Sequence, residues 1–127
     1  MSLLLDTCTL LWVAGGDARI PARVRSAISS ESDVWVSAAS AWEIAIKHAM
    51  GRLPLPVGAN QFVRGIRERY QFKSLPIDEE SALLVAKLPP LTRDPFDRIL
   101  VSQAIVHGLT IVTPDPAVTG YPIVTMW

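Results

Sequence analysis

Residues 94–113 read DPFDRILVSQAIVHGLTIVT, and this stretch predicts a helix that leads directly into a strand. Asp94 suits a helix N-cap, and Pro95 suits the first helical position, where the N–H that proline lacks would have no intrahelical partner. Gly108 is the expected C-terminal stop, because glycine adopts the left-handed conformation at little steric cost. The apolar run from Leu109 to Thr113 then has the character of a strand.

The same alternation extends along the rest of the chain. Strand character is found in five short runs, which are Leu3 to Leu5, Val34 to Val36, Leu75 to Ile77, Leu109 to Thr113 and Ile123 to Met126. Helical spacing or a start signal marks five segments, which are Pro21 to Ser29, Ala38 to Met50, Gly58 to Tyr70, Asp78 to Leu88 and Pro95 to His107. Alternating strands and helices predict an α/β fold with a parallel sheet and helices on both faces.

Length and composition indicate one globular domain over residues 1–127. The chain has 127 residues, of which 50% are hydrophobic and 19% charged, so it can form a core and is not expected to be disordered. Twelve Lys and Arg residues balance twelve Asp and Glu residues. This balance argues against a highly basic nucleic-acid binder and against an acidic tail.

Cysteine usage and hydropathy predict a soluble cytoplasmic protein. Cys8 is the only cysteine in the sequence, which excludes an intrachain disulfide and a cysteine-based zinc site. The apolar start resembles a signal sequence, but Asp6 interrupts it and no basic segment precedes it. The longest uncharged run, Ile99 to Pro114, is shorter than the about 20 residues that a membrane span needs.

Four acidic residues are candidates for a functional site. Asp6 directly follows the first predicted strand, and Asp115 follows the fourth. Ligands bind beyond the carboxyl ends of parallel strands, which is where both acids are expected. Asp97 lies in the first turn of the helix that precedes the fourth strand, so it is expected beside Asp115. Glu43 lies about one turn into the helix after the second strand.

If Asp6, Glu43, Asp97 and Asp115 converge, they form a candidate metal site. Their mutual repulsion would raise their pKa values unless cations neutralise them, and clustered carboxylates suit Mg²⁺ or Mn²⁺. Metal-assisted phosphodiester hydrolysis is the natural chemistry of such a site.

Each acid also has a structural interpretation. Asp97 follows Asp94 by three residues, so the pair could be a helix cap and a first-turn acid. Glu43 precedes Lys47 by four residues, the spacing of an exposed helical ion pair. Asp115 lies between two prolines and could be a turn residue. An acid directly after an apolar strand is harder to explain in this way, so a functional role is favoured for Asp6.

The candidate acids lie in four sequence blocks, which are Leu3-Leu4-Leu5-Asp6-Thr7, Ser37-Ala38-Ala39-Ser40-Ala41-Trp42-Glu43-Ile44, Asp94-Pro95-Phe96-Asp97-Arg98-Ile99-Leu100-Val101-Ser102-Gln103-Ala104 and Thr113-Pro114-Asp115. In this order, the four blocks resemble PIN-domain ribonucleases, specifically the VapC-type toxins of bacterial toxin–antitoxin pairs. The match is specific as a set, and no single block would suffice.

The resemblance implies a PIN-like three-layer α/β/α sandwich and a metal-dependent endoribonuclease that cleaves tRNA or another structured RNA. Asp6, Glu43, Asp97 and Asp115 would then be the catalytic and metal-binding residues, with Mg²⁺ as cofactor and Mn²⁺ as a substitute. It also implies a cognate antitoxin protein, an RNA substrate and a homodimer. Cys8 departs from the polar residue often found near the first acid, which weakens any claim of an extra ligand there.

The roles of Thr113, Asp94 and Arg98 stay open at this stage. Thr113 is a candidate to orient a ligand or water, Asp94 a cap with an outer role, and Arg98 a phosphate contact or a carboxylate partner.

Basic and aromatic residues leave further alternatives. A basic cluster is either a phosphate-steering surface or a solvated helix face, and consists of Arg64, Arg67, Arg69 and Lys73. Trp35 and Trp42 lie in apolar patterns and are predicted to be core residues, whereas Trp12 is a candidate for a partner surface.

Two other functions are compatible with an acid at the end of a strand. A receiver-like signalling module would need adjacent acids at the first strand and a late lysine, but no Lys or Arg occurs from Ile99 to Trp127. A PIN-like fold retained only for binding is the second alternative.

Overall fold

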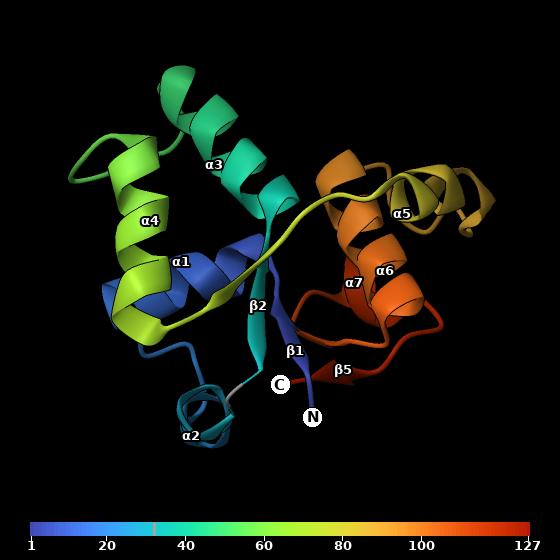
Figure 1. Cartoon of the computed structure of the whole chain (residues 1–127), viewed down its shortest axis with the longest axis horizontal. Coiled ribbons are helices and arrows are strands. Elements are labelled where there is room, and N and C mark those ends of the chain that lie inside the picture. Colours follow the sequence, from blue (N-terminus) through green and yellow to red (C-terminus); the bar gives the residue numbers. More distant parts are fainter. Residues whose placement is uncertain (32) are drawn as a thin grey trace.

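The computed structural model describes residues 1–31 and 33–127 (Figure 1). Within these residues, five strands form the sheet, which are β1 (Leu3–Leu5), β2 (Val34–Ser37), β3 (Lys73–Leu75), β4 (Thr110–Val112) and β5 (Thr125–Met126). The helices are α1 (Thr7–Gly15), α2 (Ala22–Ser30), α3 (Ala38–Ala49), α4 (Ala59–Tyr70), α5 (Glu79–Leu84), the 3₁₀ helix η1 (Val85–Lys87), α6 (Pro95–His107) and α7 (Pro116–Thr119). No helix in the described ranges is long and apolar enough to cross a membrane.

The strand order is β3-β2-β1-β4-β5, and each strand runs parallel to its neighbours. In the centre, Leu5 is in register with Val36 of β2 on one side and with Val112 of β4 on the other. The chain fills one half of the sheet from β1 to β3 and then crosses over to β4. The order therefore reverses between β1 and β4, and ligands bind at such a switch point in open α/β sheets.

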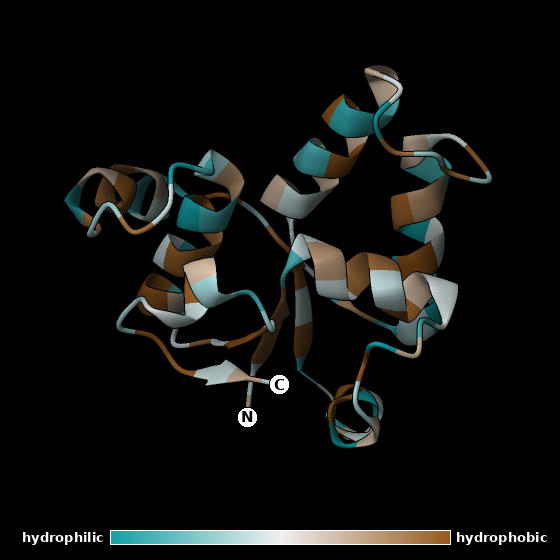
Figure 2. Cartoon of the chain, turned by 180° about the vertical axis from the view of Figure 1, so that it is seen from behind, coloured by the Kyte–Doolittle hydropathy of each residue, from teal (hydrophilic) through white to brown (hydrophobic). Residues whose placement is uncertain are grey.

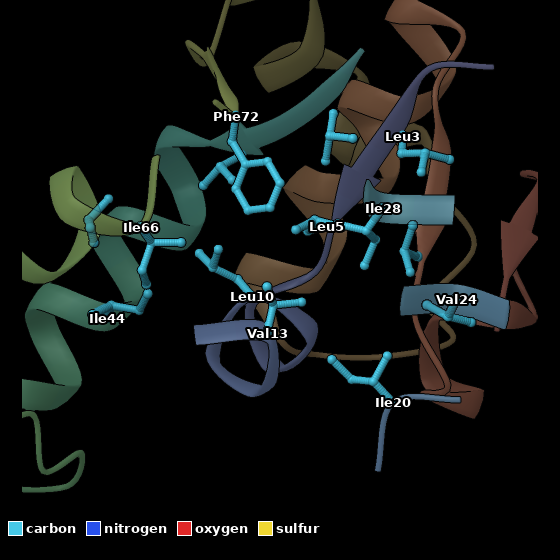
Figure 3. Close-up of a cluster of buried hydrophobic side chains, with 14 residues drawn as sticks. Leu3, Leu5, Leu10, Val13, Ile20, Val24, Ile28, Ile44, Ile66 and Phe72 are labelled. Atoms are coloured by element: carbon cyan, nitrogen blue, oxygen red, sulfur yellow. The ribbon is translucent and has the colours of Figure 1, made fainter. Parts of the chain in front are cut away.

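Two hydrophobic clusters lie on opposite faces of this sheet and confirm the predicted layering. Leu3 and Leu5 belong to one cluster, with side chains from α1, α2, α3 and α4 (Figure 3). Leu4 belongs to the other, with side chains from α6. Successive side chains of a strand point to opposite faces, so β1 contributes to both layers. Figure 2 shows hydrophobic colouring along these central strands.

The helix predicted from residues 94–113 is confirmed at both ends. The Asp94 carboxylate accepts a hydrogen bond from the Phe96 amide at 2.9 Å, and Pro95 is the first helical residue. Gly108 ends the helix with φ of 66°, in the left-handed region that glycine tolerates. Because β4 begins directly after this C-terminus, the N-terminus of α6 lies toward the carboxyl end of β4.

Two helices were not among the predicted segments. Helix α1 begins after Asp6, whose carboxylate accepts a hydrogen bond from the Thr9 amide. Apolar residues occupy every position from Leu10 to Ala14, so the sequence has no polar face that would reveal a helical period. Helix α7 spans only Pro116–Thr119 and begins after the Asp115 cap.

The third strand lies two residues before its predicted position, at Lys73–Leu75 instead of Leu75 to Ile77. It is an edge strand, and its first two residues are exposed and polar, so an apolar pattern could not reveal it. Pro76 ends it, because proline has no N–H to donate to the ladder. The predicted helix Asp78 to Leu88 divides into α5 and η1, and β5 is shorter than predicted, at Thr125–Met126.

Candidate active site

Asp6 and Asp115 stand at the carboxyl ends of the two strands that flank the switch point, β1 and β4. The negative charge of Asp115 is one of the influences that raise the pKa of Asp6, which places the two carboxylates within electrostatic range of each other. The parallel pairing of β1 with β4 therefore brings together two acids that are far apart in the sequence.

Asp6 is 5% exposed, and its carboxylate is held in place by α1. One carboxylate oxygen accepts a hydrogen bond from the Thr9 amide at 2.8 Å. Burial raises the pKa of Asp6, while hydrogen bonds from Thr113 and Thr9 oppose that rise. Because burial is the largest influence, the site disfavours an isolated negative charge at this position.

The pKa of Asp97 is raised to about 7. Burial is the largest cause, followed by the negative charges of Asp94, Asp115, Glu43 and Asp6. Each of these charges must lie near Asp97 to act on it. Their joint influence places Asp6, Glu43, Asp94 and Asp115 within electrostatic range of Asp97.

Glu43 projects from α3 and is 6% exposed. Its carboxylate accepts a hydrogen bond from the Lys47 ammonium at 2.5 Å, and this contact raises the pKa of Lys47. The helical pair predicted as an alternative is therefore present, but the carboxylate is buried beside other acids and is not on a solvated face. Lys47 supplies a positive charge to the acidic cluster.

The structural interpretations of the other acids are also partly correct. Asp6, Asp94 and Asp115 are the N-caps of α1, α6 and α7, and each accepts a backbone hydrogen bond through its carboxylate. Helix caps and convergent acids are not exclusive here, because the three helices begin at the same edge of the sheet. The capping bonds fix where these carboxylates point.

Thr113 joins two of the acids. Its hydroxyl accepts a hydrogen bond from the Asp115 amide at 3.0 Å, and its side chain lies close enough to Asp6 to lower the pKa of that carboxyl. The side chain is 1% exposed. The open role of this residue is therefore resolved in part, because it positions Asp6 and the turn that carries Asp115.

Arg98 does not point toward the acids. Its guanidinium donates to the carbonyl oxygens of Val85 at 2.8 Å and Pro89 at 3.0 Å and to the Tyr121 hydroxyl at 3.2 Å. These contacts tie the segment after α5 to α6. Neither of the two roles left open for Arg98, a phosphate contact or a carboxylate partner, matches these contacts.

A buried polar contact that sequence reasoning missed connects α3 to α6. The Ser37 hydroxyl donates to the Gln103 side-chain oxygen at 2.6 Å and accepts from the Ala39 amide at 3.0 Å. The Gln103 amide nitrogen donates to the Pro76 carbonyl at 3.1 Å. This contact holds together the helices that carry Glu43 and Asp97. The only sequence feature that could have predicted it is the presence of polar residues in an apolar helix face.

Trp42 contradicts its predicted place in the core, since it is 57% exposed. The buried residues of α3 are Ala39, Ser40, Glu43 and Ile44, and Trp42 lies beside this face. Most residues near Trp42 in the sequence are apolar, so the pattern could not indicate which face of α3 is buried. Its partner is Phe96, at 5.2 Å between ring centroids and an interplanar angle of 81°. Trp35 is partly buried and packs against the second cluster.

The chemistry of the donor set suits a hard divalent cation. Burial and neighbouring negative charges raise the pKa values of Asp6 and Asp97, and a cation bound beside these carboxylates would relieve both effects. Within residues 1–31 and 33–127, no three carboxylate, imidazole or thiol groups lie together as a metal-binding group. Helix amides engage the carboxylates of Asp6 and Asp115, and Lys47 engages that of Glu43.

Several solved structures have the same fold. A chain of DNA-bound VapBC from Salmonella typhimurium aligns with a TM-score of 0.71 and 15% identity, covering 99% of this chain and 97% of that one. VapBC2 from Rickettsia felis, bound to a promoter DNA fragment, gives 0.74 and 12%, covering 99% and 98%. FitAcB from Neisseria gonorrhoeae gives 0.68 and 20%, covering 98% and 96%. Curated protein sequences give no significant match.

The sequence itself matches a family model. The model is that of the PIN domain, and the match extends over residues 3–120. This range includes all four convergent acids and all the strands except β5. The chain belongs to the PIN domain family.

Proposed function

We propose that this protein is a metal-dependent endoribonuclease and the toxin of a VapC-type toxin–antitoxin pair. The observation that carries the proposal is the convergence of Asp6, Glu43, Asp97 and Asp115 at the switch point of a PIN-domain sheet. Two of these carboxylates are buried and two are half-buried, so the site is partly open to the solvent.

Asp6, Glu43, Asp97 and Asp115 would hold Mg²⁺, or Mn²⁺ in its place. The bound cation would lower the pKa of a water and offset negative charge on the scissile phosphate and leaving oxygen. The protein residues do the positioning. Thr113 and the Thr9 amide orient Asp6, and the Ser37–Gln103 contact fixes α3 against α6.

Lys47 has a separate role in this proposal. In the metal-free protein its ammonium neutralises Glu43, which reduces the repulsion among the acids. If Glu43 held a cation, the Lys47 side chain, which is already 44% exposed, would be displaced toward the solvent.

The proposed partners follow from the similarity to solved toxin–antitoxin structures. The similar structures are named as VapBC and FitAB assemblies, some of them bound to DNA. By analogy, we assign this chain a cognate antitoxin that restrains the nuclease, an RNA substrate such as tRNA, a homodimeric assembly and a cytoplasmic location.

Cleavage of total bacterial RNA by antitoxin-free protein tests the function. Reactions contain Mg²⁺, Mn²⁺ or EDTA, and the variant Asp97→Asn is compared with the wild type. Discrete fragments that require the metal and disappear in the variant are expected. Asp97→Asn keeps the size and shape of the side chain, and circular dichroism verifies that it is folded.

Asp17→Asn is the matched control, because it removes a carboxylate that pairs with Arg19 in the segment between α1 and α2. It is expected to cleave like the wild type. Full activity of a folded Asp97→Asn variant would overturn the site. A folded wild-type protein that binds no Mg²⁺ in calorimetry would overturn the metal-dependent mechanism.

A further inference from the structure

A groove with a cavity of about 370 Å³ lies between α3 and α4, beside the acidic site. Trp42 and Ala45 line it from α3, and Asn60, Arg64 and Arg67 line it from α4. Figure 1 shows these two helices side by side. None of the residues assigned to the nuclease site lines this groove, so its chemistry needs a separate explanation.

An aromatic pair connects the groove to the acids. Trp42 immediately precedes Glu43 on α3, and Phe96 immediately precedes Asp97 on α6. The two rings meet edge to face, with centroids 5.2 Å apart. Phe96 therefore supports the indole, which still leaves 57% of the Trp42 surface exposed. An indole held by a second ring offers a rigid surface for a flat ligand.

The other wall of the groove is cationic. Arg64 is exposed, and the buried Nε of Arg67 has no hydrogen-bond partner among residues 1–31 and 33–127. Guanidinium groups form charge-assisted hydrogen bonds with phosphates, so two arginines on one wall of the groove favour an anionic ligand. The rest of the predicted basic cluster is engaged elsewhere, because Arg69 lies over the Tyr70 ring and Lys73 pairs with Asp33.

We propose that this groove binds the unpaired part of an RNA substrate. A nucleobase stacks on Trp42, and Arg64 and Arg67 hold backbone phosphates of the same strand. This inference rests on the proposed ribonuclease function and names the part of the RNA that reaches the site. The aromatic pair stands next to Glu43 and Asp97, so the stacked nucleotide lies close to the phosphate that is cleaved.

Single-stranded RNA fits this surface better than a duplex or an acidic peptide. Stacking platforms combined with arginine-lined grooves are the usual surface for single strands. Bases in a duplex are already stacked on each other and cannot cover the indole. An acidic peptide would satisfy the arginines and leave the exposed indole face unused.

Binding of a short fluorescein-labelled oligoribonucleotide, measured by anisotropy in EDTA, tests the proposal without cleavage. Trp42→Ala is expected to weaken binding by about 5- to 150-fold, the usual range for losing one stacked base. Trp42→Phe is expected to restore most of the affinity. An oligonucleotide with the same backbone but without bases is expected to bind the wild type and Trp42→Ala equally, which a general folding defect would not produce.

The arginines are tested through the salt dependence of binding. Each of Arg64→Ala and Arg67→Ala is expected to reduce the slope of log K against log salt by about 0.7, the value for one phosphate contact on a single strand. Arg69→Ala is the matched control, because Arg69 lies on α4 but does not line the groove. Its slope is expected to equal that of the wild type.

Three results of the binding measurements would overturn the inference. They are wild-type affinity of Trp42→Ala for RNA, equal slopes for the Arg64, Arg67 and Arg69 variants, and binding of an acidic peptide in the groove with no binding of RNA. Metal-dependent cleavage that persists unchanged in Trp42→Ala would refute the groove and leave the nuclease intact. Trp42-dependent RNA binding by a chain that cleaves nothing would refute the nuclease instead.

Discussion

At the scale of single residues, Asp97 is the most informative side chain. Burial and four neighbouring carboxylates raise its pKa from 3.8 to about 7. The sequence indicated a candidate acid in a first helical turn, but a helix cap would have looked the same. Asp97 differs from an ordinary first-turn acid because its neighbours in the fold raise its pKa. These neighbours come from β1, α3 and the end of β4.

The raised pKa predicts how the stability of the metal-free protein depends on pH. Between pH 3.8 and about 7, the folded protein keeps the Asp97 proton, whereas the unfolded chain has released it. The free energy of unfolding should therefore fall as the pH rises through this window and become constant above it. Urea unfolding in EDTA at several pH values measures this slope.

Asp97→Asn is the comparison for that measurement, because it cannot ionise. Its stability should change less with pH over the same window, and it should exceed the wild type by the largest margin on the alkaline side. Identical pH profiles for the two proteins would show that Asp97 titrates as an ordinary carboxyl.

At the scale of the element, α6 shows how one residue can cap a helix and act on a site. The Asp94 carboxylate accepts hydrogen bonds from the Phe96 and Asp97 amides. Its charge is also the largest electrostatic influence on the raised pKa of Asp97. The sequence predicted the cap, and the fold adds the second role by turning the start of α6 toward the acids.

Two substitutions at Asp94 separate these roles. Asp94→Ala should lower the free energy of unfolding by about 0.5–2 kcal/mol, because the cap is lost. Asp94→Asn should retain most of the stability, since asparagine caps as well as aspartate, but it should lower the pKa of Asp97. Urea unfolding and NMR titration of the Asp97 carboxyl carbon measure the two effects. A pKa that is unchanged in Asp94→Asn would contradict the assigned influence.

At the scale of the whole molecule, β1 links the two halves of the core. Leu3, Leu4 and Leu5 are all 0% exposed, and they divide between the two hydrophobic clusters. The same strand ends at Asp6. The two layers and the acidic site are therefore expected to form and melt together, as one domain over residues 1–127.

Leu4→Ala and Leu5→Ala test this unity from opposite faces. Each should destabilise the protein by about 2–5 kcal/mol, the range for emptying a buried leucine position. Both should shift a single transition in which circular dichroism and tryptophan fluorescence coincide. Leu83→Ala is the control, because Leu83 is 68% exposed. Separate transitions for the two probes would show that the layers unfold independently.

The sequence by itself determined the class of fold and the candidate acids. The strand runs, the Asp94 cap and the Gly108 stop depend on contacts within a few residues, so the local sequence is enough to predict them. The same holds for the family, since four separated blocks were enough to indicate a PIN domain and the family model confirms it.

The tertiary structure decided what depends on contacts across the sheet. Helix α1 lacks a polar face that would reveal it, and β3 begins with exposed polar residues and is defined by its pairing with β2. The convergence of the acids follows from the pairing of β1 with β4. The exposure of Trp42 follows from the way α3 packs, because a uniformly apolar stretch does not specify which of its faces is buried.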